Sequence, residues 1–413
     1  MTGKRLSIAV IGGGIGGSTA ALALLAAGFD VHVYERAQVL REVGAGIVLT
    51  PNATRLLQRL GFGDRLEALG VAPLGWRQRR WQDGSTLLFA PLARAPGEPA
   101  MFYTSHRADV LAMLIAALPP ERLHLGHRLV ELTDHGERVE ARFENGARIE
   151  ADIVIGADGI HSAVRGLLFG PEQPRFTGCV AYRGMVPAER LRGLELPLES
   201  QLWLGPGKHF VHYPVRNARL INFVCLIDRD AWTEESWTEP GDVAVALAAY
   251  AGWHEQVRAI ISSVDEAFIW GLFDRAPLPR WSVNRVTLLG DACHPMLPFL
   301  AQGAAQAIED GATLAAVLAQ SPDDVPAALR RYESLRLPRT ARIQTTAAGN
   351  KTRNHLPDGK QQRARDADMK RGAADWSIGA SQWVYAHDAE TAALSGSLGL
   401  PPQAGQRAPT STK

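Results

Sequence analysis

The chain has 413 residues, of which 46% are hydrophobic, and 44 Lys and Arg residues against 43 Asp and Glu residues leave a net charge of +1. This length suffices for two or three domains, and the balanced charge argues against nucleic acid or a membrane surface as a partner. Three widely separated cysteines give neither a disulfide framework nor metal-ligand spacing, so we expect no metal and a reducing, cytoplasmic setting.

The N-terminal segment predicts a strand, a tight turn and a helix, because an apolar run breaks into a glycine cluster and then into Ala- and Leu-rich sequence. In the spacing Gly12-x-Gly14-x-x-Gly17, the first glycine makes the turn, the second admits a pyrophosphate, and the third lets helix and strand pack closely. A second strand, 30–34, is followed by Glu35, near the ~20-residue offset of a carboxylate that binds ribose hydroxyls. This combination favours a dinucleotide such as FAD or NAD.

Shorter elements follow in the next hundred residues. A glycine-bearing loop leads to a helix that we expect to begin within Thr50-Pro51-Asn52, and residues 76–89 alternate as a hairpin does. Another helix should open within 103–109, with Thr104 or Ser105 as its cap.

Two further motifs flank a region of different composition. An apolar strand at 153–155 runs into Gly-Ala-Asp-Gly, which puts Asp158 at the carboxyl edge of a sheet, where α/β folds bind ligands. Residues 177–273 are rich in aromatic and β-branched runs and predict a mostly antiparallel sheet. A strand ending in Gly290-Asp291 then precedes a helix at 303–319, whose N–H groups and positive dipole end face the region above the sheet edge.

Taken together, the three motifs resemble the fingerprints of a known family, the single-component FAD-dependent aromatic monooxygenases of the para-hydroxybenzoate hydroxylase type. The fingerprints are the glycine motif with Glu35, Asp158 with Arg165, and Asp291 with Pro295, in the right order between about residue 5 and about residue 345. The tail from Asn354 to Tyr385 is similar to the salicylate hydroxylase-like branch.

This resemblance implies an α/β fold with a Rossmann-like FAD-binding domain, a mostly antiparallel substrate domain and a C-terminal helical region. We expect the FAD-binding domain at 1–175 and 274–345, with the hairpin 76–89 reaching the substrate domain at 176–273. A helical region at 346–394 and a disordered tail at 395–413 complete the chain.

The resemblance also implies that FAD binds non-covalently along both parts of its domain. The glycines would approach the pyrophosphate, Arg107 the phosphate and ribityl arm, and Asp291 the ribityl chain. Asp158 with Arg165 would also serve the docking of NADH or NADPH. The full predicted cofactor set is Gly12, Gly14, Gly17, Glu35, Arg36, Val48, Arg107, Asp158, Arg165, Asp291, Gly303 and Ala304.

The activity implied is hydroxylation of a small phenolic acid with NADH or NADPH and O2 through a flavin hydroperoxide, in which the cofactor performs the oxygen chemistry. Salicylate, converted to catechol with loss of carbon dioxide, or a related hydroxybenzoate is the favoured substrate. The alternatives are a 6-hydroxynicotinate 3-monooxygenase-like enzyme, another FAD oxidoreductase of this fold, and a flavin-binding regulatory protein. The oligomeric state stays open, with a homodimer as one option.

Candidate catalytic residues lie on the strand at 208–214, where His209 and Tyr213 share one face and His212 lies on the other. Family placement favours His209 and Tyr213 as the pair that helps remove the phenol proton, and Pro295 of the third fingerprint joins this catalytic set. His212 is predicted as a further substrate contact. A structural histidine at either place remains the alternative.

An apolar wall is predicted around the substrate, and it favours a carbocyclic ring over a pyridine because an unpaired ring nitrogen is costly to bury. Its members are Val48, Leu49, Pro298 and Phe299. Arg183 or Arg219 could bind the substrate carboxylate, although each is more typical of a surface charge. Cys293 and His294 suggest packing rather than nucleophilic catalysis, and we expect Pro338 to interrupt a C-terminal helix.

Overall fold

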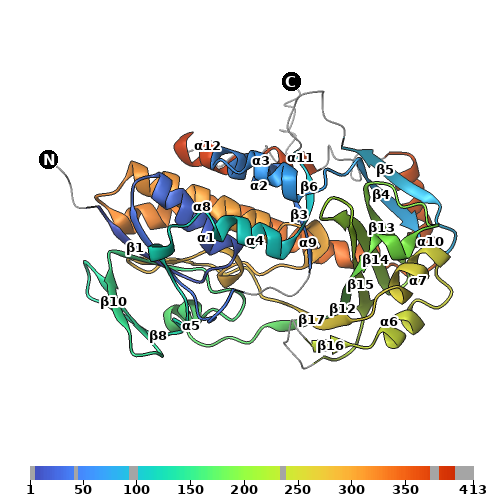
Figure 1. Ribbon diagram of the computed structural model, residues 1–413. Helices are drawn as coiled ribbons and strands as arrows, with labels where there is room; N and C mark the ends of the chain where they lie inside the picture. The colour runs from blue at the N-terminus through green and yellow to red at the C-terminus, as the bar shows by residue number, and fades with distance from the viewer. Residues whose placement is uncertain (1–4, 41–44, 93–100, 233–238, 373–380, 396–413) are drawn as a thin grey trace, which may run out of the picture.

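The computed structural model describes residues 5–40, 45–92, 101–232, 239–372 and 381–395, which form two main sheets with helices packed around them (Figure 1). Apart from Ser395, the predicted tail at 395–413 lies outside the described residues. None of the described helices combines the length and the apolar character that crossing a bilayer requires.

A five-stranded parallel sheet lies at one end of the molecule, in the order β18-β11-β1-β2-β7. Its central strands are continuous apolar runs, as strands covered on both faces require. Val10 and Ile155 are completely buried there, and each such side chain contributes about 1.5–3 kcal/mol. The strands are Ser7–Ile11 (β1), Asp30–Tyr34 (β2), Leu123–His124 (β7), Ile153–Gly156 (β11) and Val286–Leu288 (β18).

Helices α1 (Ile15–Ala26) and α8 (Gly303–Gln320) lie side by side above this sheet, and a three-stranded antiparallel sheet lies below it (Figure 1). The three layers share one hydrophobic core. The close contact of the two helices depends on small residues, because a Cβ on Gly311 would lie 2.8 Å from the Ala20 backbone. The lower strands are Leu129–Asp134 (β8), Val139–Phe143 (β9) and Arg148–Ala151 (β10).

An eight-stranded, mostly antiparallel sheet forms the other end of the molecule, in the order β16-β17-β12-β15-β14-β13-β4-β5. The predicted hairpin contributes β4 and β5, and β4 joins the sheet through a parallel pairing with β13. Helices α6 (Val243–Ala249) and α7 (Glu255–Ser262) share a core with one face. The strands are Gly75–Arg80 (β4), Thr86–Pro91 (β5), Arg175–Pro187 (β12), Glu199–Gly205 (β13), Lys208–Val215 (β14), Leu220–Asp228 (β15), Glu239–Gly241 (β16) and Ala267–Asp274 (β17).

A small two-stranded sheet, β3 (Gly46–Leu49) with β6 (Tyr103–His106), contacts β14 of the large sheet. This pairing corrects the helix start that we predicted at Thr104 or Ser105. Both residues are extended in β6, so α4 (Arg107–Ile115) begins later, with His106 at its N-cap and no side-chain cap. The helix predicted from Thr50 is present as α2 (Pro51–Arg59), with Thr50 as its N-cap.

The predicted interruption at Pro338 is wrong, because α9 (Val325–Asn354) runs through it as one helix of 30 residues. A proline removes one backbone hydrogen bond from a helix interior. The side chains on either side of it, Arg336 and Arg339, bind buried carboxylates of α8. We attribute the unbroken helix to these tertiary contacts.

The remaining short elements connect and cover these layers. They are the α-helices Gly63–Leu69 (α3), Ala163–Phe169 (α5), Lys360–Lys370 (α10), Gln382–Tyr385 (α11) and Ala389–Ser395 (α12), and the 3-10 helices Pro120–Arg122 (η1), Ala188–Leu191 (η2), Gly290–Ala292 (η3) and Pro298–Leu300 (η4).

Candidate active site

The three sequence motifs meet because the strands that carry them end level with one another. The parallel register aligns Ile11 of β1 with Gly156 of β11, and Gly156 with Leu288 of β18. Each motif therefore begins at the same carboxyl edge, where ligands of open α/β sheets bind.

The three glycines of the first motif meet different surroundings. Gly12 has φ +112°, and a Cβ there would lie 2.4 Å from the Ala157 carbonyl oxygen. A Cβ on Gly17 would lie 2.0 Å from the Gly12 carbonyl oxygen, so this glycine permits close packing. A Cβ on Gly14 would meet nothing within 4 Å, and Gly14 is the N-cap of α1 without a side-chain cap. The uncapped helix N-terminus is thus open toward an anionic ligand.

Glu35 holds the turn of the glycine motif. Its carboxylate accepts hydrogen bonds from the N–H of Gly13 at 2.7 Å and of Ala37 at 2.8 Å. Contact of Glu35 with an adenosine ribose stays a prediction. The next residue, Arg36, is exposed on the wall of the cavity described below.

Asp158 and Arg165 organise the second motif in different ways. Asp158 lines the cavity, and it accepts from the Ser162 hydroxyl at 2.5 Å and from the Ala163 N–H at 2.7 Å. Burial raises the pKa of Asp158, against these hydrogen bonds. Arg165 is buried instead and donates to the carbonyl oxygens of Ile160 and Ala292. Arg165 therefore ties the second motif to the third, and direct cofactor contact by its side chain is not supported.

One cavity of about 1240 Å³ extends from the sheet edge to the large sheet. Ligand pockets commonly measure about 300–1,000 Å³, so this cavity has room for a dinucleotide and a small ring. The predicted residues that line it are Gly14, Arg36, Val48, Arg107, Asp158, Arg183, His209, Tyr213, Asp291, Pro295, Pro298, Phe299, Gly303 and Ala304. Those that do not line it are Gly12, Gly17, Glu35, Leu49, Arg165, His212 and Arg219.

The floor of the cavity is one face of the eight-stranded sheet, on which the register sets out three rows of side chains. One row contains His209, Leu226 and Trp270; the next contains Gln78, Leu202, Val211, Val224 and Arg183; the third contains Trp76, Ser200, Tyr213 and Asn222. The centre of this floor is apolar, and polar groups stand around it.

The two histidines of β14 lie on opposite faces, as strand alternation requires. His209 faces the cavity, whereas His212 packs beside Phe210 in the core, with ring centroids 5.7 Å apart. Burial lowers the pKa of His212 to about 3. The prediction that His212 contacts the substrate therefore fails on geometry, while a catalytic role for His209 and Tyr213 stays a prediction.

Several polar atoms of the floor are buried without a partner among the described residues, and they mark places for a polar ligand. These atoms are Trp76 Nε1, Gln78 Oε1 and Asn222 Nδ2. The other amide atom, Asn222 Oδ1, accepts from the Gly46 N–H at 2.8 Å. Sequence reasoning missed these residues because only the pairing of distant strands brings them together.

The two arginines predicted as possible partners of a substrate carboxylate differ in exposure and in position. Arg219 is exposed and donates to the Arg216 carbonyl oxygen. Arg183 is buried in the cavity floor, with its guanidinium carbon 4.5 Å from the centroid of the Trp270 ring. The expectation of a surface charge is therefore wrong for Arg183.

The predicted apolar wall is only partly as expected. Val48, Pro298 and Phe299 line the cavity, but Leu49 is buried in a neighbouring core with α2 and α4. The wall at Pro298 and Phe299 belongs to η4, which is followed by Ala301 in a left-handed conformation with φ +52°. This loop delivers the cavity-lining N-terminus of α8.

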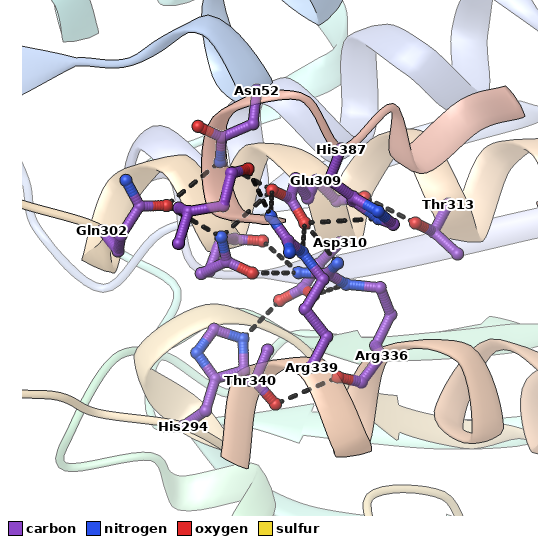
Figure 2. Close-up of polar contacts among 12 residues, drawn as sticks. Asn52, His294, Gln302, Glu309, Asp310, Thr313, Arg336, Arg339, Thr340 and His387 are labelled. Atoms are coloured by element: carbon purple, nitrogen blue, oxygen red, sulfur yellow. Dashed lines mark hydrogen bonds and ion pairs between the residues drawn. The ribbon is translucent and has the colours of Figure 1, made fainter. Parts of the chain in front are cut away.

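A buried polar network supports that N-terminus (Figure 2). Gln302, the N-cap of α8, donates to Thr50 at 2.9 Å and accepts from Asn52 Nδ2 at 3.0 Å. The same Asn52 amide donates to Glu309 Oε1 at 2.6 Å, and Arg339 donates to both Glu309 oxygens. Burial alone would raise the pKa of Glu309, but the guanidinium groups of Arg339 and Arg336 hold it below its usual value.

The Cys293 and His294 pair belongs to this interior. His294 Nε2 lies 2.6 Å from Asp310 Oδ2, and the three residues bring ligand-type atoms within 4.8 Å of one another. Asp310 Oδ1 already accepts a hydrogen bond from Arg336 Nε at 2.7 Å. Burial raises the pKa of the Cys293 thiol, which disfavours the thiolate that a metal would need. We therefore interpret the cluster as structural.

The sequence and the structure are similar to those of known FAD-dependent monooxygenases. The chain matches the FAD binding domain family over residues 5–347. It is 42% identical to 3-amino-4-hydroxybenzoate 2-monooxygenase PtmB3 of Streptomyces platensis, over 94% of this chain and 98% of the relative. It is 40% identical to 6-hydroxynicotinate 3-monooxygenase of Bordetella bronchiseptica, over 85% and 92%. A solved salicylate hydroxylase substrate complex is similar, with a TM-score of 0.81, 29% identity, and coverage of 97% and 99%.

Proposed function

Because this chain belongs to the FAD binding domain family of aromatic monooxygenases, we propose that its substrate is a benzoate with a hydroxyl group para to the carboxyl group. The chain is a single-component FAD-dependent aromatic hydroxylase that uses NADH or NADPH and O2. The family predicted from the three fingerprints is thereby confirmed, and the proposal concerns the ring and the orientation that this site accepts.

The names of the two relatives share one feature of substrate chemistry. In 3-amino-4-hydroxybenzoate and in 6-hydroxynicotinate, the hydroxyl group lies across the ring from the carboxyl group. Salicylate, the substrate favoured by sequence, carries the two groups on adjacent carbons. The relatives therefore support a para arrangement over an ortho one.

The observation that carries the proposal is the diagonal between His209 and Arg183 across the cavity floor. The two residues stand on strands that flank β15, and the register sets them one row apart. With strand spacing of about 4.8 Å and a rise of about 3.3 Å per residue, their Cα atoms are about 12 Å apart. Part of this Cα–Cα separation is taken up by the two side chains. The remaining distance suits an aromatic ring with its hydroxyl at His209 and its carboxylate at Arg183.

The groups around this diagonal fit a substituted carbocycle. Val211 and Val224 between the two residues give the ring an apolar floor. Gln78 lies on β4, two strands from His209 and on the side of β14 opposite to Arg183. Its buried Oε1 is an acceptor without a partner among the described residues. An amino group ortho to the hydroxyl would supply the missing donor. We therefore infer that 3-amino-4-hydroxybenzoate is a better fit than its unsubstituted parent.

The cavity residues at the carboxyl edge would hold FAD, because Gly14 leaves room for the pyrophosphate and Arg36 and Arg107 offer positive charge beside it. When bound, FAD supplies hydride acceptance from the nicotinamide and activation of O2. The protein residues orient the ring, exclude water and remove the proton of the hydroxyl, which increases the electron density of the ring.

Substrate-stimulated oxidation of NADH and NADPH by the FAD-loaded protein tests the proposal. The acids to compare are 3-amino-4-hydroxybenzoate, 4-hydroxybenzoate, salicylate and 6-hydroxynicotinate, with products identified by mass spectrometry. We expect hydroxylated product from the para acids and the highest kcat/KM for the amino-substituted one. Product from salicylate alone would overturn the para orientation, and product from 6-hydroxynicotinate alone would overturn the carbocyclic ring.

A further inference from the structure

Three side chains connect the cavity to the outer surface of the protein. His209 Nδ1 lies 2.6 Å from His355 Nε2, and His355 Nδ1 lies 2.8 Å from Asp228 Oδ1. His209 lines the cavity and is 2% exposed, whereas the Asp228 side chain is 42% exposed. The series therefore begins at the candidate substrate position and ends in solvent.

Backbone contacts hold the middle residue of this series in place. His355 is the C-cap of α9, and its carbonyl oxygen accepts from the Gly207 N–H at 3.0 Å. The Gly207 carbonyl oxygen in turn accepts from the Asp228 N–H at 2.9 Å. Phe299 covers the two histidines, with its ring centroid 5.3 Å from that of His209 and 6.3 Å from that of His355. The two rings are thus shielded and fixed relative to each other.

The hydrogen-bonding capacity of each group sets the direction of the series. A carboxylate only accepts, so His355 Nδ1 donates to Asp228. A neutral imidazole carries one N–H, so His355 Nε2 accepts from His209 Nδ1. The same rule leaves His209 Nε2 as an acceptor on the ring that lines the cavity. This is the arrangement needed to receive a proton from a substrate hydroxyl.

We propose that His209, His355 and Asp228 form a proton relay that carries the proton of the substrate hydroxyl from the cavity to solvent. This inference rests on the proposed function, since it requires a phenolic substrate. His355 and Asp228 act through His209 and are positioning and transfer residues rather than groups that touch the substrate.

The relay step balances without any redox partner. The substrate O–H bond breaks, its electron pair stays on oxygen, and N–H forms at His209 Nε2. His209 Nδ1 gives its proton to His355 Nε2, and His355 Nδ1 gives its proton to Asp228, which releases it to water. Passage of a proton in the opposite direction when product leaves restores both tautomers.

The pKa values along the series agree with transfer rather than storage of the proton. Burial and the neighbouring His355 ring hold the pKa of His209 well below its ordinary value, so His209 does not retain the charge. Burial would raise the pKa of Asp228, but the hydrogen bond from His355 and the charge of Lys351 lower it, so Asp228 is ionised at neutral pH.

Other titratable and charged groups face the series from adjacent elements. Lys351 of α9 lies 3.3 Å from Asp228, and Cys179 of β12 lies near the same carboxylate. Burial raises the pKa of Cys179 to about 12, so this thiol stays neutral. Tyr213 and Arg353 share the cavity with His209, and burial raises the pKa of Tyr213. Among the described residues, the contacts of His209, His355 and Asp228 form a continuous series that joins the cavity to solvent.

Proton release on substrate binding tests the relay without turnover. FAD-loaded protein without nicotinamide is mixed with 3-amino-4-hydroxybenzoate in weakly buffered solution, and a pH indicator reports released protons while the flavin absorbance reports binding. The variants are Asp228→Asn and His355→Gln, with Asp228→Glu as the conservative variant. Asp230→Asn is the matched control, because Asp230 is exposed two residues further along.

We expect wild type, D228E and D230N to release protons as the acid binds. D228N and H355Q should bind it with similar affinity but release protons more slowly, by on the order of tenfold or more. Release at the wild-type rate in D228N would overturn the relay, and so would an equal loss in D228E. Absence of binding by the wild type for every para-hydroxylated acid would overturn the proposed function, and the relay with it.

Discussion

Arg339 meets Glu309 through two hydrogen bonds, from Nε to Oε2 at 2.7 Å and from Nη2 to Oε1 at 2.8 Å, with both side chains excluded from solvent. The pair joins α9 to α8 directly behind the helix N-terminus that lines the cavity (Figure 2). A buried ion pair adds little to the free energy of unfolding compared with a well-packed apolar pair. Removal of one partner, however, leaves an uncompensated buried charge that destabilises the protein. The network therefore makes the position of the α8 N-terminus sensitive to single substitutions.

Replacement of Arg339 by Met should destabilise the protein by about 3–5 kcal/mol, because Glu309 loses a cation that compensates its buried charge. Urea denaturation of wild type and variant at one pH measures this difference. Arg330 is exposed on the same helix, so Arg330→Met should change the free energy of unfolding by less than about 0.5 kcal/mol. Equal effects of the two substitutions would contradict the importance of the buried pair.

Substitution of the glycines should separate folding from cofactor binding. Gly17→Ala places a Cβ 2.0 Å from the Gly12 carbonyl oxygen, so we expect a lower Tm even without FAD. Gly14→Ala places its Cβ in open space, so the apoprotein should keep its Tm while its FAD affinity falls. Thermal unfolding of the apoproteins and fluorescence titration with FAD measure the two effects. Unchanged FAD affinity in the folded G14A protein would contradict the proposed pyrophosphate position.

The carboxyl edge of the parallel sheet was predictable because each of its motifs is local. A strand followed by glycines or by Gly-Asp can be recognised within about ten residues, and parallel register then aligns the motifs. The cavity floor was not predictable in this way. Arg183, Asn222 and Gln78 line one cavity floor only because β12, β15 and β4 occupy one sheet. The parallel pairing of β4 with β13 joins segments more than a hundred residues apart.

Local patterns also missed the contacts made at the end of α9. His355 lies in a polar segment that the sequence shows to be similar to the salicylate hydroxylase-like branch. Its contact with His209 depends instead on the path of α9, which continues through Pro338 and ends beside the large sheet. The wrong prediction of a helix break at Pro338 has the same cause. Helix propensity describes local preference only, and it does not include the tertiary contacts of Arg336 and Arg339 with buried carboxylates of α8.

Replacement of Arg183 by Met should weaken binding of the carboxylate substrate. A hydrogen bond to a charged group contributes about 1.5–3 kcal/mol, so KM should rise by roughly 10- to 100-fold while FAD affinity stays constant. The corresponding amide, which lacks the negative charge, should discriminate far less between wild type and variant. Arg219→Met, at an exposed arginine, is the matched control. An equal rise in KM for acid and amide would argue against a contact between Arg183 and the carboxylate.

Acid should destabilise the protein through His212, independently of catalysis. The folded-state pKa of this residue is about 3, because burial and the nearby Arg79 disfavour the charged ring, whereas an exposed histidine has a pKa of about 6.5. The unfolded chain therefore binds a proton that the folded chain rejects. The contribution to stability is complete above about pH 6.5 and is lost as pH falls toward 3, with a slope of about 1.4 kcal/mol per pH unit.

The variant His212→Phe removes this group while keeping an aromatic ring beside Phe210. Between pH 7.5 and pH 5.0, the wild type should lose about 2 kcal/mol more of unfolding free energy than the variant does. Urea denaturation at the two pH values gives this difference, and the other histidines cancel because both proteins contain them. His135→Asn, at an exposed turn, should follow the wild type. If H212F and wild type lose stability in parallel, His212 must take up its proton in the folded state, and its ring cannot be held in the dry interior between β14 and its neighbours.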